Sequence, residues 1–254
     1  MSKLVALSRQ THQQVRIDKS KVEQQASELH MIPVVLSEFR KLLVHYPIVF
    51  SKSGETGQFM CSALLGFEQG ENLFWQQGAW QGIYVPLQVT RQPFFLGQQE
   101  TGSGQEPNSA KEPVMCINEA HPAVGNKGEA LFDAQGQPSQ YLQNQQRDLM
   151  TLLQGEQLTQ QFIARLLELG LLTAMSLQIQ FADNSSTKVN GLYTIDEDKL
   201  DALDNDTLAE LQQAGYLSAI YAMVHSTGQI YNLIDKKNQR LNQAQSWFKA
   251  AGQD

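Results

Sequence analysis

The sequence is poor in cysteine, and this scarcity excludes a class of protein. Its two cysteines, Cys61 and Cys116, form no C-x-x-C pair and cannot supply a disulfide framework for a chain of 254 residues. Cys61 lies in an apolar run, where a thiol behaves as a small hydrophobic side chain. Two unpaired thiols are typical of a reducing compartment. We therefore predict a cytoplasmic protein, with export without a leader as the alternative.

Positive charge is also scarce. The chain has 19 Lys and Arg against 26 Asp and Glu, a formal net charge of −7, and no run of five basic residues. Proteins that bind nucleic acid gain much of their affinity from Lys and Arg that displace counterions. We therefore expect neither nucleic acid nor an anionic membrane surface as a partner.

Long apolar runs are missing too. A helix that spans a bilayer needs about 20 apolar residues, whereas the longest runs here are short pieces such as residues 32–36. The apolar N-terminus is interrupted by Ser8 and Arg9, too early for a signal peptide. The hydrophobic fraction is nevertheless 41%, which is enough for a folded core. The sequence therefore predicts a soluble, globular protein without a membrane span.

Apolar residues at helical spacing indicate several helices. Val35, Phe39 and Leu42 share one face, and Pro47 disfavours a helical conformation at the residue before it. Asp204 or Asp206 can cap a helix that Gly215 closes. The expected helices cover residues 36–45, 141–153, 159–169, 204–214 and 217–249, the last with a break near Gly228.

The clearest strand signal is a strict alternation of apolar and polar residues over 175–181. A turn at residues 183–186 and a second run in phase over 189–195 complete a predicted hairpin. Further strands or extended segments are expected at residues 47–50, 58–67, 80–87 and 92–96. A polar stretch over residues 97–113 reads as a long loop.

This order of elements predicts the fold class. Helix, strands, helices, hairpin and helices do not repeat as β-α-β, so a doubly wound parallel sheet is disfavoured. We expect an α+β fold with a mixed or antiparallel sheet, hairpins and flanking helices. We expect one domain over residues 1–254, with two subdomains meeting near the loop 97–113 as the alternative.

Motifs for known chemistry are weak. Glu119-Ala120-His121 offers two metal ligands without a third nearby, and the acids of residues 196–206 lack the glycine of a calcium loop. Those acids suit helix N-termini better, where the dipole favours negative charge. Gly102-Ser103-Gly104 lacks the lysine of a P-loop, and no G-x-S-x-G elbow occurs. We predict no metal and no cofactor, and whether the chain is an enzyme stays open.

One stretch is chemically denser than the rest. Residues 72–95 hold two of the three tryptophans, Trp75 and Trp80, together with Tyr84, Arg91 and Phe94. Aromatic rings beside an arginine suit the recognition of a peptide or a sugar. The same residues also suit a packed β core. Both interpretations stay open at this point.

Several short motifs follow one another along the chain: Glu38-Phe39, Tyr46-Pro47-Ile48-Val49-Phe50, Gly70-Glu71-Asn72-Leu73-Phe74, Trp80-x-x-x-Tyr84-Val85-Pro86, Arg91-x-Pro93-Phe94, Gly128-x-x-Leu131-Phe132-Asp133-x-x-Gly136 and Gly191-Leu192-Tyr193-x-Ile195-Asp196. In this order they resemble motifs of the bacterial SapC family, and the resemblance covers about residues 4–234. The family tends to carry two arginines where this sequence has Thr90-Arg91-Gln92, which argues against a clamp of two guanidinium groups on an anion.

The resemblance implies little about biochemical activity. The family is named for an association with a bacterial surface layer. The resemblance also implies a gene neighbourhood that encodes outer-membrane receptors, cupin-like proteins and flavin-dependent halogenase-like proteins. A peptide-transporter permease of the same name is a different protein, because it spans the membrane.

Our leading hypothesis is a non-catalytic binding or assembly protein that recognises a peptide or protein partner. The alternatives are an enzyme or accessory subunit that acts on a peptide or small molecule with oxygen- or flavin-dependent neighbours, and a surface-layer component. Glu38 and Arg91 are a candidate ion pair. The candidate binding residues are Glu38, Tyr46, Glu71, Asn72, Trp80, Tyr84, Arg91 and Phe94.

Overall fold

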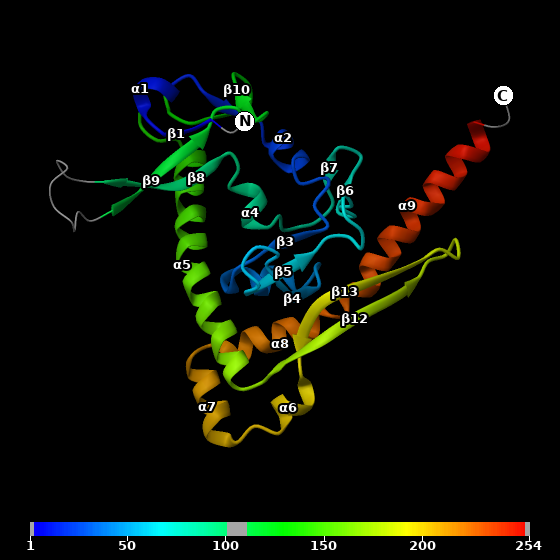
Figure 1. The fold of residues 1–254 in the computed structure, drawn as a ribbon. Coiled ribbons are helices and arrows are strands. Elements are labelled where there is room, and N and C mark those ends of the chain that lie inside the picture. The colour runs from blue at the N-terminus through cyan, green and yellow to red at the C-terminus, as the bar shows by residue number, and fades with distance from the viewer. Residues whose placement is uncertain (1–2, 101–110, 252–254) are drawn as a thin grey trace. The chain divides into compact units, whose positions relative to one another are not determined.

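The chain divides into two compact units in a computed structural model that describes residues 3–100 and 111–251. The first unit comprises Met1–Ala26 and Leu87–Gln154, and the second comprises Ser27–Pro86 and Gly155–Asp254. Figure 1 labels their helices and strands. The expectation of one domain over residues 1–254, or of two subdomains meeting near residues 97–113, stays a prediction.

The first unit is built on two small antiparallel sheets. One has the strand order β1-β9-β8 and the other β10-β2-β11. β1 lies at the edge of the first of these sheets and pairs with β9 alone. The elements are β1 (Leu4–Ala6), α1 (Arg9–His12), β2 (Arg16–Ile17), α2 (Lys19–Gln24), α4 (Leu87–Thr90), β8 (Phe94–Glu100), β9 (Lys111–Asn118), β10 (Val124–Gly125) and β11 (Glu129–Ala130).

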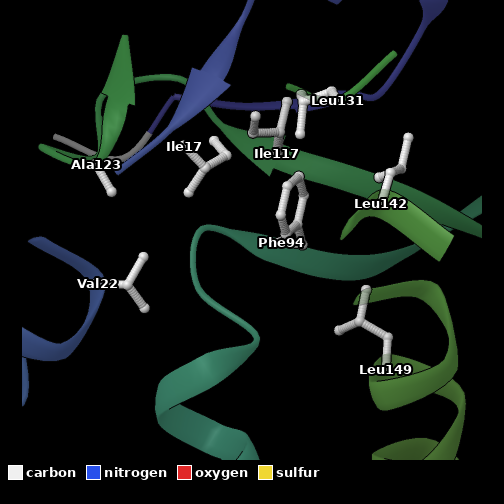
Figure 2. Close-up of a cluster of buried hydrophobic side chains, with 8 residues drawn as sticks. All are labelled: Ile17, Val22, Phe94, Ile117, Ala123, Leu131, Leu142 and Leu149. Carbon is white, nitrogen blue, oxygen red and sulfur yellow. The ribbon is translucent and has the colours of Figure 1, made fainter. Parts of the chain in front are cut away.

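Aliphatic side chains and one ring form the core of the first unit. Figure 2 shows Phe94 of β8 between Ile117 of β9 and Leu149, with Ile17 and Leu142 nearby. Phe94, Ile117 and Ile17 have no exposed surface. Burial of such apolar surface contributes about 25 cal/mol per Å², so this cluster stabilises the unit.

The second unit is built on one five-stranded antiparallel sheet, in the order β12-β13-β4-β5-β3. The predicted hairpin is confirmed: β12 alternates between partly buried and exposed positions, and Asn184 takes φ 67° in the turn. The strands are β3 (Met31–Pro33), β4 (Ile48–Lys52), β5 (Phe59–Leu64), β12 (Leu172–Gln180) and β13 (Ser186–Ile195), with a separate two-stranded ribbon of β6 (Trp75–Gln76) and β7 (Ala79–Trp80).

Two helices of the second unit, α6 (Glu197–Asp201) and α7 (Asn205–Gln213), begin at carboxylate caps, and α7 is followed by a glycine as expected. Asp196 accepts a hydrogen bond from the backbone N–H of Lys199, and Asp204 accepts one from Thr207. Gly215 follows α7 in the left-handed conformation, with φ 74°. The elements are η1 (Leu36–Glu38), α3 (Phe39–Leu42), α6 (Glu197–Asp201), α7 (Asn205–Gln213), α8 (Tyr216–Ser226) and α9 (Gln229–Ala251).

Two separate helices were expected at residues 141–153 and 159–169, and that expectation is wrong. A single helix, α5 (Gln140–Glu168), covers both. Gly155 stays inside it because of packing: a Cβ added there would lie 2.8 Å from a methyl carbon of Val35. Close packing of the helix on this segment therefore requires a glycine, although glycine weakens a helix by about 1 kcal/mol.

Two further expectations need correction. Residues 80–87 were expected as an extended segment, but β7 ends at Trp80 and α4 begins at Leu87. The loop expected over residues 97–113 is partly strand, because β8 reaches Glu100 and β9 starts at Lys111. Residues 101–110 of that range lie outside the described residues.

The fold class is confirmed as α+β with antiparallel sheets, hairpins and helices. Within residues 3–100 and 111–251, no helix combines the length and the apolar character needed to cross a bilayer.

Candidate functional site

Glu38, the first of the predicted binding residues, is a buried hydrogen-bond acceptor in the second unit. It lies at the end of η1 and is 1% exposed. One carboxylate oxygen accepts a hydrogen bond from the Tyr84 hydroxyl at 2.9 Å, and the other accepts one from the Val35 N–H at 3.1 Å. A buried carboxylate is tolerated only when it is bonded in this way. Glu38 therefore joins the helix start to the loop that carries Tyr84.

Tyr46 and Trp80 extend the same network. Trp80 Nε1 donates to the Tyr46 hydroxyl at 2.8 Å, and that hydroxyl donates to the Tyr84 carbonyl at 2.5 Å. Burial raises the pKa of Tyr46, so its hydroxyl stays protonated and keeps its donor role. Gly82 packs directly on Tyr46, because a Cβ added at Gly82 would collide with Tyr46 Oη. The loop between Trp80 and Tyr84 is thus held on both sides.

The rings of this region pack on one another rather than facing solvent. Phe74 lies 4.4 Å from Tyr46, centroid to centroid, and stacks on Trp80 at 6.5 Å. Tyr46, Phe74 and Trp80 are all buried. Tyr84 is half-buried, with the Lys41 ammonium 5.0 Å from its ring centroid. Most of the predicted aromatic surface therefore supports a loop instead of presenting rings.

Glu71 and Asn72 hold α9 in place within the second unit. Glu71 accepts hydrogen bonds from the Phe67 N–H at 3.0 Å and from Lys237 Nζ at 2.6 Å. Arg240 donates to the backbone carbonyl of Asn72 at 2.7 Å and to that of Trp75 at 3.0 Å. These two residues act as docking points for a helix that lies far from them in the sequence.

Arg91 and Phe94 belong to the first unit, apart from the other six candidates. Arg91 donates to Gln88 at 2.6 Å and to the Phe94 carbonyl at 3.1 Å, and its guanidinium lies 4.5 Å from the Phe95 ring centroid. Burial lowers the pKa of Arg91. Phe94 has no exposed surface. The proposed pairing of Glu38 with Arg91 joins residues of different units and stays a prediction.

A polar pocket with a volume of about 390 Å³ lies beside the Phe74 ring in the second unit. Lys236 of α9 places its ammonium 5.0 Å from the Phe74 centroid, and burial lowers the pKa of Lys236. The buried Nε2 of His45 has no hydrogen-bond partner among the described residues. The pocket is lined by His45, Phe74, Gln81, Gln229, Asn232, Asp235, Lys236 and Gln239.

Sequence reasoning identified α9 as a helix but missed its contribution to this pocket. Gln229, Asn232, Lys236 and Gln239 recur at intervals of three or four residues, which places them along one face of α9. That polar stripe is visible in the sequence. Its position beside Phe74 is not, because it depends on tertiary packing.

The other sequence-derived candidates have structural roles. Glu119 forms an ion pair with Lys3 at 2.6 Å and a hydrogen bond with His12 Nε2 at 3.2 Å, and His121 accepts a hydrogen bond from the Ala123 N–H. No group of three His, Cys, Asp or Glu side chains gathers into a possible metal site in the described parts of the chain. Cys61 is a buried free thiol whose pKa is raised by burial, as expected for a small hydrophobic residue.

Comparison with known proteins agrees with the resemblance seen in the motifs. The family model described as SapC matches residues 7–233. No curated protein and no solved structure shows a significant match to the chain.

Proposed function

This chain belongs to the SapC family, and from that premise we propose that it is a non-catalytic binding or assembly protein that recognises a peptide or protein partner. The contact point is the loop Gly82–Tyr84 of the second unit. Ile83 at its centre is 91% exposed, more than any other large hydrophobic side chain identified as exposed in the described residues. This exposed isoleucine on a braced loop is the observation that carries the proposal.

Burial of an exposed isoleucine in an interface contributes favourably to the free energy of binding. Transfer of such a side chain from water into an apolar pocket of a partner contributes about 1.5–3 kcal/mol. A few anchors of this kind supply most of the affinity of a protein interface. Ile83 is therefore suited to insert into an apolar pocket, and Lys41 above the Tyr84 ring supplies a charged group for the rim.

The buried network adds preorganisation to this anchor. Tyr46 bonds the Tyr84 carbonyl, Glu38 bonds the Tyr84 hydroxyl, and Gly82 packs on Tyr46. A loop that is already ordered loses little conformational entropy on binding, so more of the contact energy appears as affinity. On this proposal Glu38, Tyr46, Trp80 and Tyr84 are positioning residues for the loop rather than direct contacts.

The chemistry of the partner follows from composition. The net charge of −7 disfavours nucleic acid and favours an apolar or basic segment of a protein. The two buried free thiols, Cys61 and Cys116, support a reducing compartment, so we propose the cytoplasm as the place of binding.

A photo-crosslinking residue placed at position 83 tests the proposal in the native cells. We expect one crosslinked partner that is absent when the same residue replaces Leu158, a leucine of the second unit that is 52% exposed. With the purified partner, Ile83→Asp should weaken the Kd by roughly 30-fold, equivalent to about 2 kcal/mol. Leu158→Asp is the matched control and should leave the Kd unchanged.

Tyr46→Phe sharpens the same test, because it keeps the ring and removes the hydroxyl that holds the loop. We expect weaker binding than in the wild type, with a smaller loss than for Ile83→Asp. Equal partner binding by folded Ile83→Asp and Leu158→Asp would refute the proposal.

A further inference from the structure

We propose that the polar pocket beside Phe74 binds a free α-amino acid, a small zwitterion that carries one ammonium and one carboxylate. The pocket lies wholly within the second unit and has a volume of about 390 Å³. Pockets of about 300–1,000 Å³ are usual for small ligands. This inference goes beyond the proposed function, because the ligand is a small molecule and Ile83 does not line the pocket.

The cationic end of the site is Lys236. Among the described residues no carboxylate forms an ion pair with it, and its ammonium rests over the Phe74 ring at 5.0 Å. The next residue shows the contrast: Lys237 is bonded to Glu71 at 2.6 Å and to Glu68 at 3.5 Å. Lys237 therefore holds α9 in place through carboxylates of the protein, whereas Lys236 is available to pair with a carboxylate of a ligand.

The anionic end of the site is Asp235. It lines the same pocket, and no ion pair to it is found within the described residues. Successive residues of an α-helix point about 100° apart, because 3.6 residues make one turn. Asp235 and Lys236 both line the pocket and leave α9 in directions about 100° apart, so they present opposite charges at separate points of the lining. A ligand with both charges satisfies both residues, whereas a ligand with one charge leaves the other residue unpaired.

Amide groups and one imidazole complete the lining. The amides of Gln81, Gln229, Asn232 and Gln239 line the pocket. Gln81 Nε2 already donates to the Gln76 and Ala79 carbonyls, and Asn232 Nδ2 donates to Gln229 Oε1. His45 Nε2 is buried without a hydrogen-bond partner among the described residues, although such atoms are normally satisfied. Few apolar side chains line the pocket, which favours a polar amino acid over an aliphatic one.

Two residues of the proposed site, Asp235 and Lys236, lie just beyond residue 233, where the match to the family model ends.

Calorimetric titration of the full chain with each of the standard L-amino acids tests the proposal. We expect measurable binding of at least one polar amino acid. Its des-amino analogue and its decarboxylated analogue should each bind at least 10-fold more weakly, because each leaves one pocket charge unpaired. Equal binding of an analogue with a single charge, or heat from none of the amino acids, would overturn the assignment.

Variants that each remove one charge from the pocket test whether the amino acid binds there. Lys236→Met keeps the aliphatic stem over Phe74, and Asp235→Asn keeps the shape of the carboxylate. Each should weaken the amino acid at least 10-fold, and Lys236→Met should no longer distinguish the amino acid from its decarboxylated analogue. The matched controls are Lys188→Met and Asp201→Asn, which change exposed residues away from the pocket and should bind like the wild type.

Two further variants keep the outcome interpretable. If Lys236→Met does not fold, Lys236→Gln replaces it, and circular dichroism verifies the fold of each protein. Ile83→Asp should keep amino-acid binding while losing the macromolecular partner. Failure of one proposal is thereby distinguishable from failure of the other. Wild-type affinity in both folded Asp235→Asn and a folded Lys236 variant would refute the site.

Discussion

The two units hold their buried aromatic residues in different ways. In the first unit Phe94 is surrounded by aliphatic side chains such as Ile117 and Leu149, and packing alone stabilises it. In the second unit Tyr46 and Trp80 are also buried, but each is tied into the hydrogen-bond network that contains Glu38 and Tyr84. Aromatic content therefore does not tell whether a ring fills a core or braces a loop. The polar partners of each ring distinguish the two cases.

This difference predicts different responses to substitution. A ring held by packing should be sensitive to lost volume, since the cost grows with the cavity left behind. A ring held by hydrogen bonds should be sensitive to loss of one polar atom at constant volume, because the partners stay buried and unsatisfied. Two experiments test this contrast, and a third tests an ion pair at the surface of the first unit; they follow in order of decreasing effect.

Phe94→Ala should have the largest effect. Removal of a fully buried ring lowers the free energy of unfolding by about 4 kcal/mol. Hydrogen exchange read by mass spectrometry should show the greatest loss of protection in β8 and β9. Phe94→Leu is the control, and should cost less than about 1.5 kcal/mol because most of the volume is kept. Similar losses for both variants would contradict a volume-limited core.

Tyr46→Phe should have an intermediate effect in the second unit. It keeps the ring but leaves Trp80 Nε1 and the Tyr84 carbonyl without this partner, at a cost of about 2 kcal/mol. Urea unfolding followed by tryptophan fluorescence measures the change. Tyr231→Phe, at a tyrosine that is 75% exposed, should change the free energy of unfolding by less than about 0.5 kcal/mol. An equal effect of the two variants would remove the distinction between the units.

Substitution of Glu119 should have the smallest effect on stability, and this effect should depend on pH. The hydrogen bond from Lys3 lowers the pKa of Glu119 below 4.5 in the folded first unit, and the contact with His12 adds to this. The unfolded chain therefore binds the proton more readily. Stability from this carboxylate is present at neutral pH and is lost as the pH falls below about 4.5 and through the folded pKa.

The matching measurement compares unfolding midpoints at about pH 7 and about pH 3.5. Glu119→Gln should show a smaller difference between the two midpoints than the wild type. Glu28→Gln, at an exposed glutamate of the second unit, should keep the wild-type difference. An unchanged pH response in Glu119→Gln would mean that the pair with Lys3 does not form in solution.

Local patterns predicted much of the fold. The alternation over residues 175–181 predicted β12, and Asp204 with Gly215 predicted both ends of α7. These signals act within a few residues, so they are readable without tertiary information. The continuity of α5 was missed because Gly155 is required by Val35, which is distant in sequence.

The candidate site was predictable only in part. Glu38, Tyr46, Trp80 and Tyr84 were selected for their chemistry, and the structure brings them into one hydrogen-bond network. Their burial was not readable, since a ring next to a carboxylate suits either a surface or a braced core. Asp235 and Lys236 were missed because their role depends on α9 docking through Glu71 and Asn72.

Gly82 has a consequence for how this protein tolerates mutation. Its φ lies outside the left-handed region, so the backbone would accept any residue, yet the Tyr46 hydroxyl fills the space that a Cβ would take. Deep mutational scanning should therefore find Gly82 intolerant even to alanine. A second substitution that removes the Tyr46 hydroxyl should make alanine at position 82 tolerated. The contact would then be detected as genetic epistasis between positions 46 and 82.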